Sequence, residues 1–117
     1  MSEHSIRSSR VHLDVATALA KVDEVTGPLR SVPLFQHGSL LLKFYAPHGT
    51  DLQTLHTRDE VYVVAQGDGI FFDGTERRSF AAGDVLFVAA GTTHRFEEFS
   101  ADFGTWVMFY GPEGGET

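Results

Sequence analysis

The chain has no cysteine among its 117 residues, so it can form no disulfide framework and has no thiolate to act as nucleophile or metal ligand. No apolar run approaches the ~18 residues that a membrane-spanning helix requires, and we expect no membrane partner. The first residues also lack the apolar stretch of a secretory signal. These absences together favour a reducing, cytoplasmic setting.

Basic residues are scarce as well. Nine Lys and Arg stand against sixteen Asp and Glu, which gives a formal net charge of −7. Nucleic-acid binding depends on neutralising phosphates with Lys and Arg, so we expect no nucleic-acid partner. The acidity is more in keeping with the solubility of a small protein.

The hydrophobic content is sufficient for one core. Hydrophobic residues make up 42% of the chain and include ten Phe. Because chains of this length seldom divide, we expect a single domain over residues 1–117. Residues 1–10 are polar and are expected to form a flexible N-terminus.

One short helix is predicted within residues 11–25. Good helix formers follow Asp14, a candidate N-cap, and apolar residues recur at i, i+4 and i+7 from Val15. Gly27 and Pro28 then end the helical pattern.

Residues 31–110 show a different pattern, in which short β-rich runs alternate with Gly, Asp and Pro. Asp73-Gly74 between two such runs is a strong hairpin signal. About eight strands at this spacing predict an all-β antiparallel sandwich or barrel rather than alternating β and α units. The runs cover residues 31–36, 39–45, 60–65, 69–72, 77–80, 84–88, 94–99 and 105–110.

Two segments, residues 49–67 and 83–98, contain the residues most suited to chemistry. The first contains His56 and Glu60, and the second contains His94. Neutral imidazole and carboxylate oxygen hold catalytic divalent ions while leaving positions open for a substrate.

The first segment resembles the first motif of the cupin superfamily, which consists of small jelly-roll β-barrels. That motif runs Gly, five residues, His-x-His, three or four residues, Glu, six residues, Gly. His56, Glu60 and Gly67 match its second His, its Glu and its last Gly.

The second segment resembles the second motif of the same superfamily, which runs Gly, five residues, Pro-x-Gly, two residues, His, three residues, Asn. Gly83, Gly91 and His94 fall in register, while Ala89 replaces the Pro and Glu98 replaces the Asn. The resemblance implies an all-β jelly-roll barrel preceded by one short N-terminal helix.

The main departure from the first motif is Thr54, which stands where the first His is expected. Gln53 offers an amide oxygen one residue earlier, and sugar-phosphate isomerases of the superfamily use a Gln ligand beside His. On a regular strand residues 53 and 56 face opposite sides. Gln53 therefore either reaches the metal because a bulge or the loop from Gly49 redirects its side chain, or supports the metal ligands without binding the metal itself.

The resemblance implies a metal site formed by His56, Glu60 and His94, with Gln53 as a fourth ligand. Period-two alternation points Glu60 inward with Tyr62, and a carboxylate so placed is costly unless a cation accompanies it. The expected cofactor is one divalent transition metal, Mn, Fe, Zn or Ni, because an amide ligand makes the site harder.

Glu98 leaves two alternatives open. It either faces the cavity near His94 as a general acid or base with a raised pKa, or ends its strand in solvent. The residues expected to line the cavity are Phe44, Tyr62, Phe96, Trp106 and Met108. Since the strand with Trp106 is apolar on both faces, its outer face is expected to pack against a neighbour, which favours a homodimer.

The resemblance implies a metal-dependent enzyme, dioxygenase-like or isomerase-like, that acts on a small organic molecule in the barrel. Two alternatives remain. One is a non-catalytic small-molecule-binding or storage protein. The other is a metal-free, sugar-binding or epimerase-like protein that uses the His and Glu side chains as acid and base.

Overall fold

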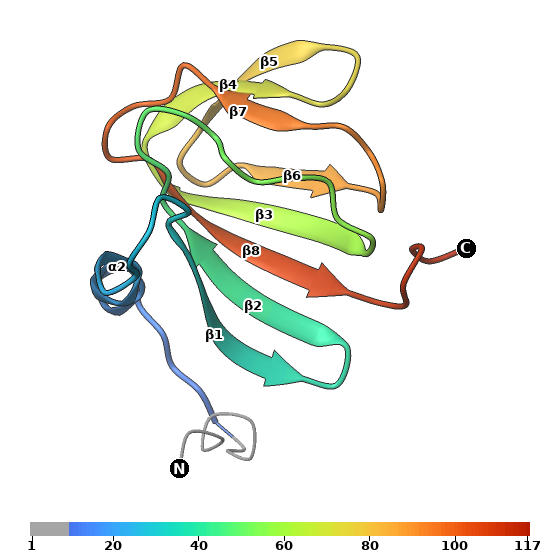
Figure 1. Ribbon diagram of the computed structural model, residues 1–117, viewed down its shortest axis with the longest axis horizontal. Helices are drawn as coiled ribbons and strands as arrows, with labels where there is room; N and C mark the ends of the chain where they lie inside the picture. The colour runs from blue at the N-terminus through green and yellow to red at the C-terminus, as the bar shows by residue number, and fades with distance from the viewer. Residues whose placement is uncertain (1–9) are drawn as a thin grey trace.

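The computed structural model describes residues 10–117, so the expected flexible segment 1–10 lies, apart from Arg10, outside the described residues. The described chain forms one helix and eight strands, and the strand pattern expected from the sequence is confirmed (Figure 1). The elements are α2 (Val15–Asp23), β1 (Ser31–His37), β2 (Leu40–Tyr45), β3 (Asp59–Gln66), β4 (Asp68–Phe72), β5 (Arg77–Ala81), β6 (Val85–Val88), β7 (Arg95–Glu97) and β8 (Gly104–Tyr110).

The strands form two antiparallel sheets that face each other, as Figure 1 shows. The larger sheet has the order β1-β2-β8-β3-β6, and the smaller has the order β5-β4-β7. Strands distant in the sequence are therefore neighbours, and β8 lies between β2 and β3. This arrangement confirms the all-β jelly-roll fold with one short helix.

The helix α2 lies outside the larger sheet (Figure 1). Asp14 caps it by accepting a hydrogen bond from the backbone N–H of Thr17 at 2.8 Å, as Asp at this position favours. Ala18 and Val22 are fully buried on one side of the helix and pack with Phe44 of β2. The helix thereby covers part of the outer face of the sheet.

Alternation along the strands separates an inner from an outer face. Glu60, Tyr62 and Val64 of β3 are buried on the inner face, as the period of two predicts. Val107 of β8 joins the same core. Most of the inner core is aromatic and aliphatic, formed by Tyr45, Tyr62, Val64, Phe71, Phe80, Val88, Phe96, Phe103 and Val107.

Strand β7 is shorter than its predicted range of 94–99, and the reason lies in the backbone. Glu98 has a φ of 48°, in the left-handed region that side chains other than Gly seldom adopt. The extended backbone therefore stops at Glu97, and the alternation of faces ends there.

Candidate metal centre

Three side chains meet between the two sheets. Glu60 is the second residue of β3, His56 lies in the connection just before that strand, and His94 directly precedes β7. One ligand atom from each residue lies within 4.8 Å of the others. Nε2 of His56 contacts Glu60 Oε1, Nε2 of His94 lies 3.4 Å from the same oxygen, and the two Nε2 atoms are 3.3 Å apart.

Both imidazoles are oriented from behind by the backbone. Nδ1 of His56 lies 3.0 Å from the carbonyl oxygen of Arg58, and Nδ1 of His94 lies 2.8 Å from that of Thr92. A carbonyl oxygen can only accept, so each Nδ1 donates a proton and each neutral Nε2 presents a lone pair. This orientation by an outer hydrogen bond is typical of histidines that bind metals.

The carboxylate of Glu60 is buried without a hydrogen-bond donor from residues 10–117. Its side chain is fully buried, and both oxygens lack a hydrogen-bond partner in that part of the chain. These oxygens face the Nε2 lone pairs of the two imidazoles. When both histidines are neutral, the site therefore holds only hydrogen-bond acceptors around one buried negative charge. Such a group is costly unless a cation balances it. A divalent ion fits this set, since it would supply the charge and accept all three lone pairs.

Without a metal, protons can balance the same charge. Burial opposes ionisation of Glu60, but contact with His56 and His94 outweighs it and lowers the pKa of the carboxyl group. Burial also lowers the pKa of His94, but the contacts with Glu60 and the Thr92 carbonyl outweigh it and raise that pKa above its ordinary 6.5. The site therefore attracts cationic charge, either as protons or as a metal ion.

Tyr62 connects the site to a polar network. Its hydroxyl lies 3.0 Å from Nε2 of His94 and accepts a hydrogen bond of 3.0 Å from the Gln53 amide nitrogen. Burial, followed by the negative charge of Glu60, raises the pKa of Tyr62 well above its ordinary value. The phenol thus remains protonated beside the candidate metal position.

Asp51 anchors this network. Its two carboxylate oxygens accept hydrogen bonds from the Tyr45 hydroxyl at 2.5 Å, from the Phe96 backbone N–H at 2.9 Å and from the Gln53 amide at 3.3 Å. Because a carboxylate only accepts, the amide nitrogen of Gln53 must face Asp51 and Tyr62. The sequence interpretation did not assign a role to Asp51 or Tyr45. The sequence signal that could have indicated a role for Asp51 was its position two residues before Gln53.

Gln53 and His56 lie in the connection between β2 and β3 rather than on a regular strand, so the alternation that separates their faces does not apply. In the structure the Gln53 amide contacts the Tyr62 hydroxyl, and that hydroxyl in turn contacts His94. Direct ligation by Gln53 stays a prediction.

A cavity of about 270 Å³ lies beside His56, between the β2–β3 connection and the inner face of β1, β2 and β8. This volume is just below the ~300–1,000 Å³ usual for ligand sites, so its size suits a small molecule. A second opening at His56, about 580 Å³, is lined by Leu55, His56, Thr57, Ala90, Gly91, Glu113 and Gly114. The lining of the smaller cavity is Leu29, Ser31, Lys43, Tyr45, Leu52, Gln53, Thr54, Leu55, His56, Val107 and Phe109.

Three residues that the sequence placed in the cavity lie elsewhere. Phe44 and Trp106 pack edge to face, with ring centroids 4.9 Å apart, in the cluster beneath α2. Trp106 and Met108 line a groove on the outer face of the larger sheet. The register explains this correction, because Val107 occupies the inner face of β8 and its two neighbours must point outward.

Tyr62 and Phe96 do lie on the inner side. The Tyr62 hydroxyl reaches the site, whereas Phe96 packs behind it, with ring centroids 4.8 Å apart. Glu98 is exposed, because the left-handed backbone at this residue turns its side chain away. Of the two alternatives for Glu98, the structure therefore shows the solvent-exposed strand end and not an acid facing the cavity.

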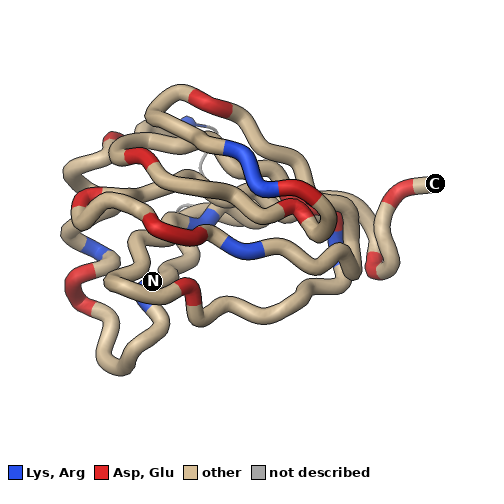
Figure 2. Tube along the Cα trace, turned by 90° about the horizontal axis from the view of Figure 1, so that it is seen from above, with Lys and Arg blue, Asp and Glu red and all other residues tan. Residues whose placement is uncertain are grey.

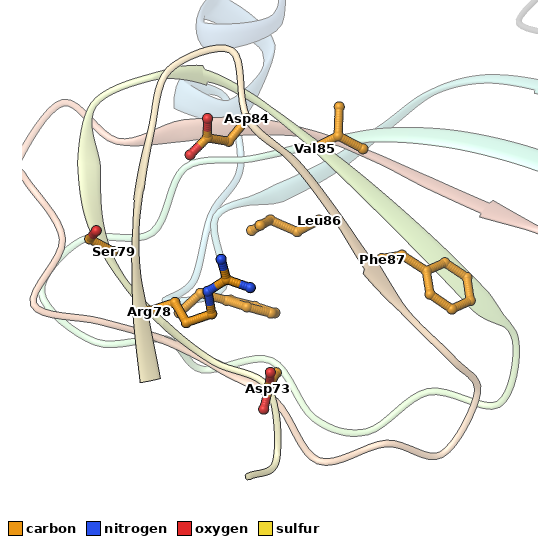
Figure 3. A pocket seen from close by; sticks show the side chains of 8 residues that line it. Asp73, Arg78, Ser79, Asp84, Val85, Leu86 and Phe87 are labelled. Atoms are coloured by element: carbon orange, nitrogen blue, oxygen red, sulfur yellow. The ribbon is translucent and has the colours of Figure 1, made fainter. Parts of the chain in front are cut away.

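Another cavity, of about 440 Å³, lies between β5 and β6 (Figure 3). The Arg78 side chain projects into it, with Asp73 and Asp84 at its rim. Phe71 separates it from the candidate metal centre, since this ring also packs 6.1 Å from the His94 ring.

Comparison with known proteins gives a family match and many similar structures. A protein-family model described as "Cupin domain" matches residues 42–108. An uncharacterised protein of Streptomyces coelicolor is 41% identical over 64 residues, which cover 55% of this chain and 61% of that protein. The match thus spans about three fifths of the relative's length.

Solved structures are similar in fold at low sequence identity. A cupin 2 conserved barrel domain protein from Salinispora arenicola has a TM-score of 0.63 and 19% identity, with 89% of each chain covered. The DMSP lyase DddQ from Ruegeria pomeroyi has a TM-score of 0.60 and 20% identity, with 69% of this chain and 46% of that chain covered. At these identities the likeness concerns the fold alone. Within residues 10–117 no helix is long and apolar enough to cross a membrane.

Proposed function

Since this chain belongs to the Cupin_2 family of cupin domains, we propose that it is a metal-dependent enzyme acting on a small organic molecule in the cavity beside His56. The observation that carries the proposal is the buried Glu60 carboxylate, which receives no hydrogen bond from the described residues and faces the lone pairs of two oriented imidazoles. A fold alone does not assign an activity. The donor set and its cavity are what favour a reactive metal centre.

Two imidazoles and one carboxylate are the ligands expected of mononuclear Fe(II) sites with open positions, and they also suit Mn, Zn and Ni. When bound, such an ion polarises a carbonyl or activates water or dioxygen. This range includes both the dioxygenase-like and the isomerase-like activities expected from the sequence.

The residues of the chain have separate tasks in this proposal. Glu60 neutralises one of the two positive charges of the ion, and His56 and His94 are held in place by backbone carbonyls. Tyr62 keeps a neutral phenol next to His94. The β2–β3 connection forms one wall of the cavity beside His56.

Metal analysis of protein purified without an affinity tag tests the proposal. We expect about one divalent ion per chain, lost in His56→Ala and in His94→Ala because each removes one of three ligands. His48→Ala is the matched control, since His48 is an exposed histidine of the same connection. Full metal content in both ligand variants would end the assignment. A wild-type chain that binds none of Mn, Fe, Zn and Ni would favour the metal-free acid–base alternative.

We also propose that the chain forms a homodimer through the outer face of the larger sheet. Val85 and Phe87 of β6 are 65% and 57% exposed, and pairing with β3 places them beside Val63 and Val61 on that face. An apolar groove of about 520 Å³ continues the same surface across β8 and β2. Sedimentation should show a dimer that Phe87→Lys converts to monomer with its metal content unchanged, and a monomeric wild-type chain would contradict this.

A further inference from the structure

Among residues 10–117, one Lys or Arg lines the cavity beside His56, and its charge has no partner. Lys43 lies at the middle of β2 and lines this cavity. Its neighbours Phe44 and Tyr45 are fully or nearly fully buried, whereas Lys43 remains partly exposed. Within residues 10–117 its ammonium group makes no ion pair or hydrogen bond. A Lys on the inner face of a strand is unusual unless the charge has a use.

The register fixes the position of Lys43 relative to the candidate metal centre. Lys43 pairs with Val107 of β8, which pairs with Tyr62 of β3, so the three residues form one row across the inner face. Neighbouring strands are about 4.8 Å apart, so the backbones of Lys43 and Tyr62 are separated by roughly 10 Å. A small molecule bound at the metal by one end can therefore reach the ammonium group with the other.

The lining of the cavity differs in composition from the acidic molecule as a whole. The chain has sixteen Asp and Glu and a net charge of −7. Figure 2 shows acidic residues on many separate segments of the described chain. Of the residues that the structure describes, Lys43 lines the cavity beside His56 and no Asp or Glu does. The other polar residues that line it are Ser31, Tyr45, Gln53, Thr54 and His56. Asp51 and Glu60 lie behind this lining, in contact with Tyr45, Gln53 and His56, so Lys43 is the charged side chain that faces the cavity itself.

Resting on the metal centre proposed above, we propose that Lys43 is a specificity-determining residue and that the substrate is a small organic acid. One carboxylate of this acid pairs with the Lys43 ammonium group, and an oxygen at its other end faces His56, Glu60 and His94. A divalent ion with Glu60 retains one positive charge, and Lys43 adds another. The site therefore matches an acid with up to two negative charges.

Calorimetric titration of the metal-loaded chain with malonate, succinate and glutarate tests this assignment, with the three corresponding diamides as uncharged controls. We expect at least one dicarboxylate to bind more tightly than its diamide. Lys43→Met should weaken that binding by roughly 10- to 100-fold, since a hydrogen bond to a charged group contributes about 1.5–3 kcal/mol. Lys43→Arg should retain most of the affinity because it keeps the charge.

Lys21→Met is the matched control, because Lys21 is an exposed lysine on α2. Metal content and thermal unfolding of Lys43→Met report whether the fold and the metal centre are intact. Equal binding by wild type and Lys43→Met, or no preference of the wild type for any dicarboxylate, would overturn the inference while leaving the metal centre in place. If the wild type binds no metal, the same titration of the metal-free chain decides the role of Lys43 separately from the proposed function.

Discussion

Replacing Glu60 with Gln should change the stability of the chain in opposite directions with and without metal. Glu60 is fully buried and its oxygens have no donor. In Glu60→Gln the amide donates to the lone pairs of the neighbouring imidazoles and removes a buried charge. Relief of one unsatisfied buried group is worth about 1–3 kcal/mol. For a chain of this size that corresponds to a rise in Tm of roughly 4–12 °C.

The sign of this effect depends on pH. The pKa of His94 is raised in the folded chain, because contact with Glu60 outweighs burial. The ion pair therefore stabilises the fold below the unfolded histidine value of about 6.5 and is lost as the pH rises through the folded value. The gain from Glu60→Gln, measured in the presence of a chelator, should consequently appear at pH values above the raised pKa of His94, and it should shrink or reverse in mild acid.

Metal should reverse the order of stability. At a metal concentration of 100 times Kd the wild type gains about 2.7 kcal/mol, whereas Glu60→Gln loses one of three ligands and most of this gain. Thermal and urea unfolding with chelator or with Mn, Fe(II), Zn or Ni measure both differences. Glu76→Gln, at an exposed turn, is the control. The reasoning is refuted if Glu60→Gln lowers stability equally with and without metal, because Glu60 would then serve the fold alone.

Two further substitutions test the surroundings of the site and the fold. Gln53→Ala should weaken metal affinity about 10- to 100-fold, since it removes the hydrogen bond to Tyr62 that supports the ligands. Thr54→Ala should have little effect on metal affinity. Metal titrations that show the reverse order would contradict this role of Gln53. Gly67→Ala should lower the stability to urea by about 1–3 kcal/mol. Its φ is +86°, and an added Cβ would lie 2.6 Å from Cα of Phe103. Gly38→Ala, with a φ of +58° and open space around it, should cost less, and equal losses in both would refute the steric argument.

The spacing of residues in the sequence was sufficient to predict that His56, Glu60 and His94 come together at the candidate metal centre. His56 and Glu60 are close in the chain, and the period of two along β3 sends Glu60, Tyr62 and Val64 to one face. The match of His94 to a second motif then supplied the distant partner, which the structure brings to 3.4 Å from Glu60. Such short-range rules work because they depend on backbone geometry.

The same periodicity could not decide which face of β8 is the inner one. Trp106 and Val107 are both apolar, so alternation alone fits either assignment, and only pairing with β2 and β3 put Val107 inside. Nor could it locate the end of β7, because the positive φ of Glu98 is set by the turn into the next loop. Both errors come from tertiary context.

The sequence by itself therefore determined the all-β architecture, the short helix and the identity of three candidate ligands, since turn residues, alternation and motif spacing are local properties. Only the tertiary structure decided what surrounds those ligands. The Asp51 network, the free Lys43 and the apolar outer face depend on which strands become neighbours. That choice is made by burial and pairing between residues far apart in the chain.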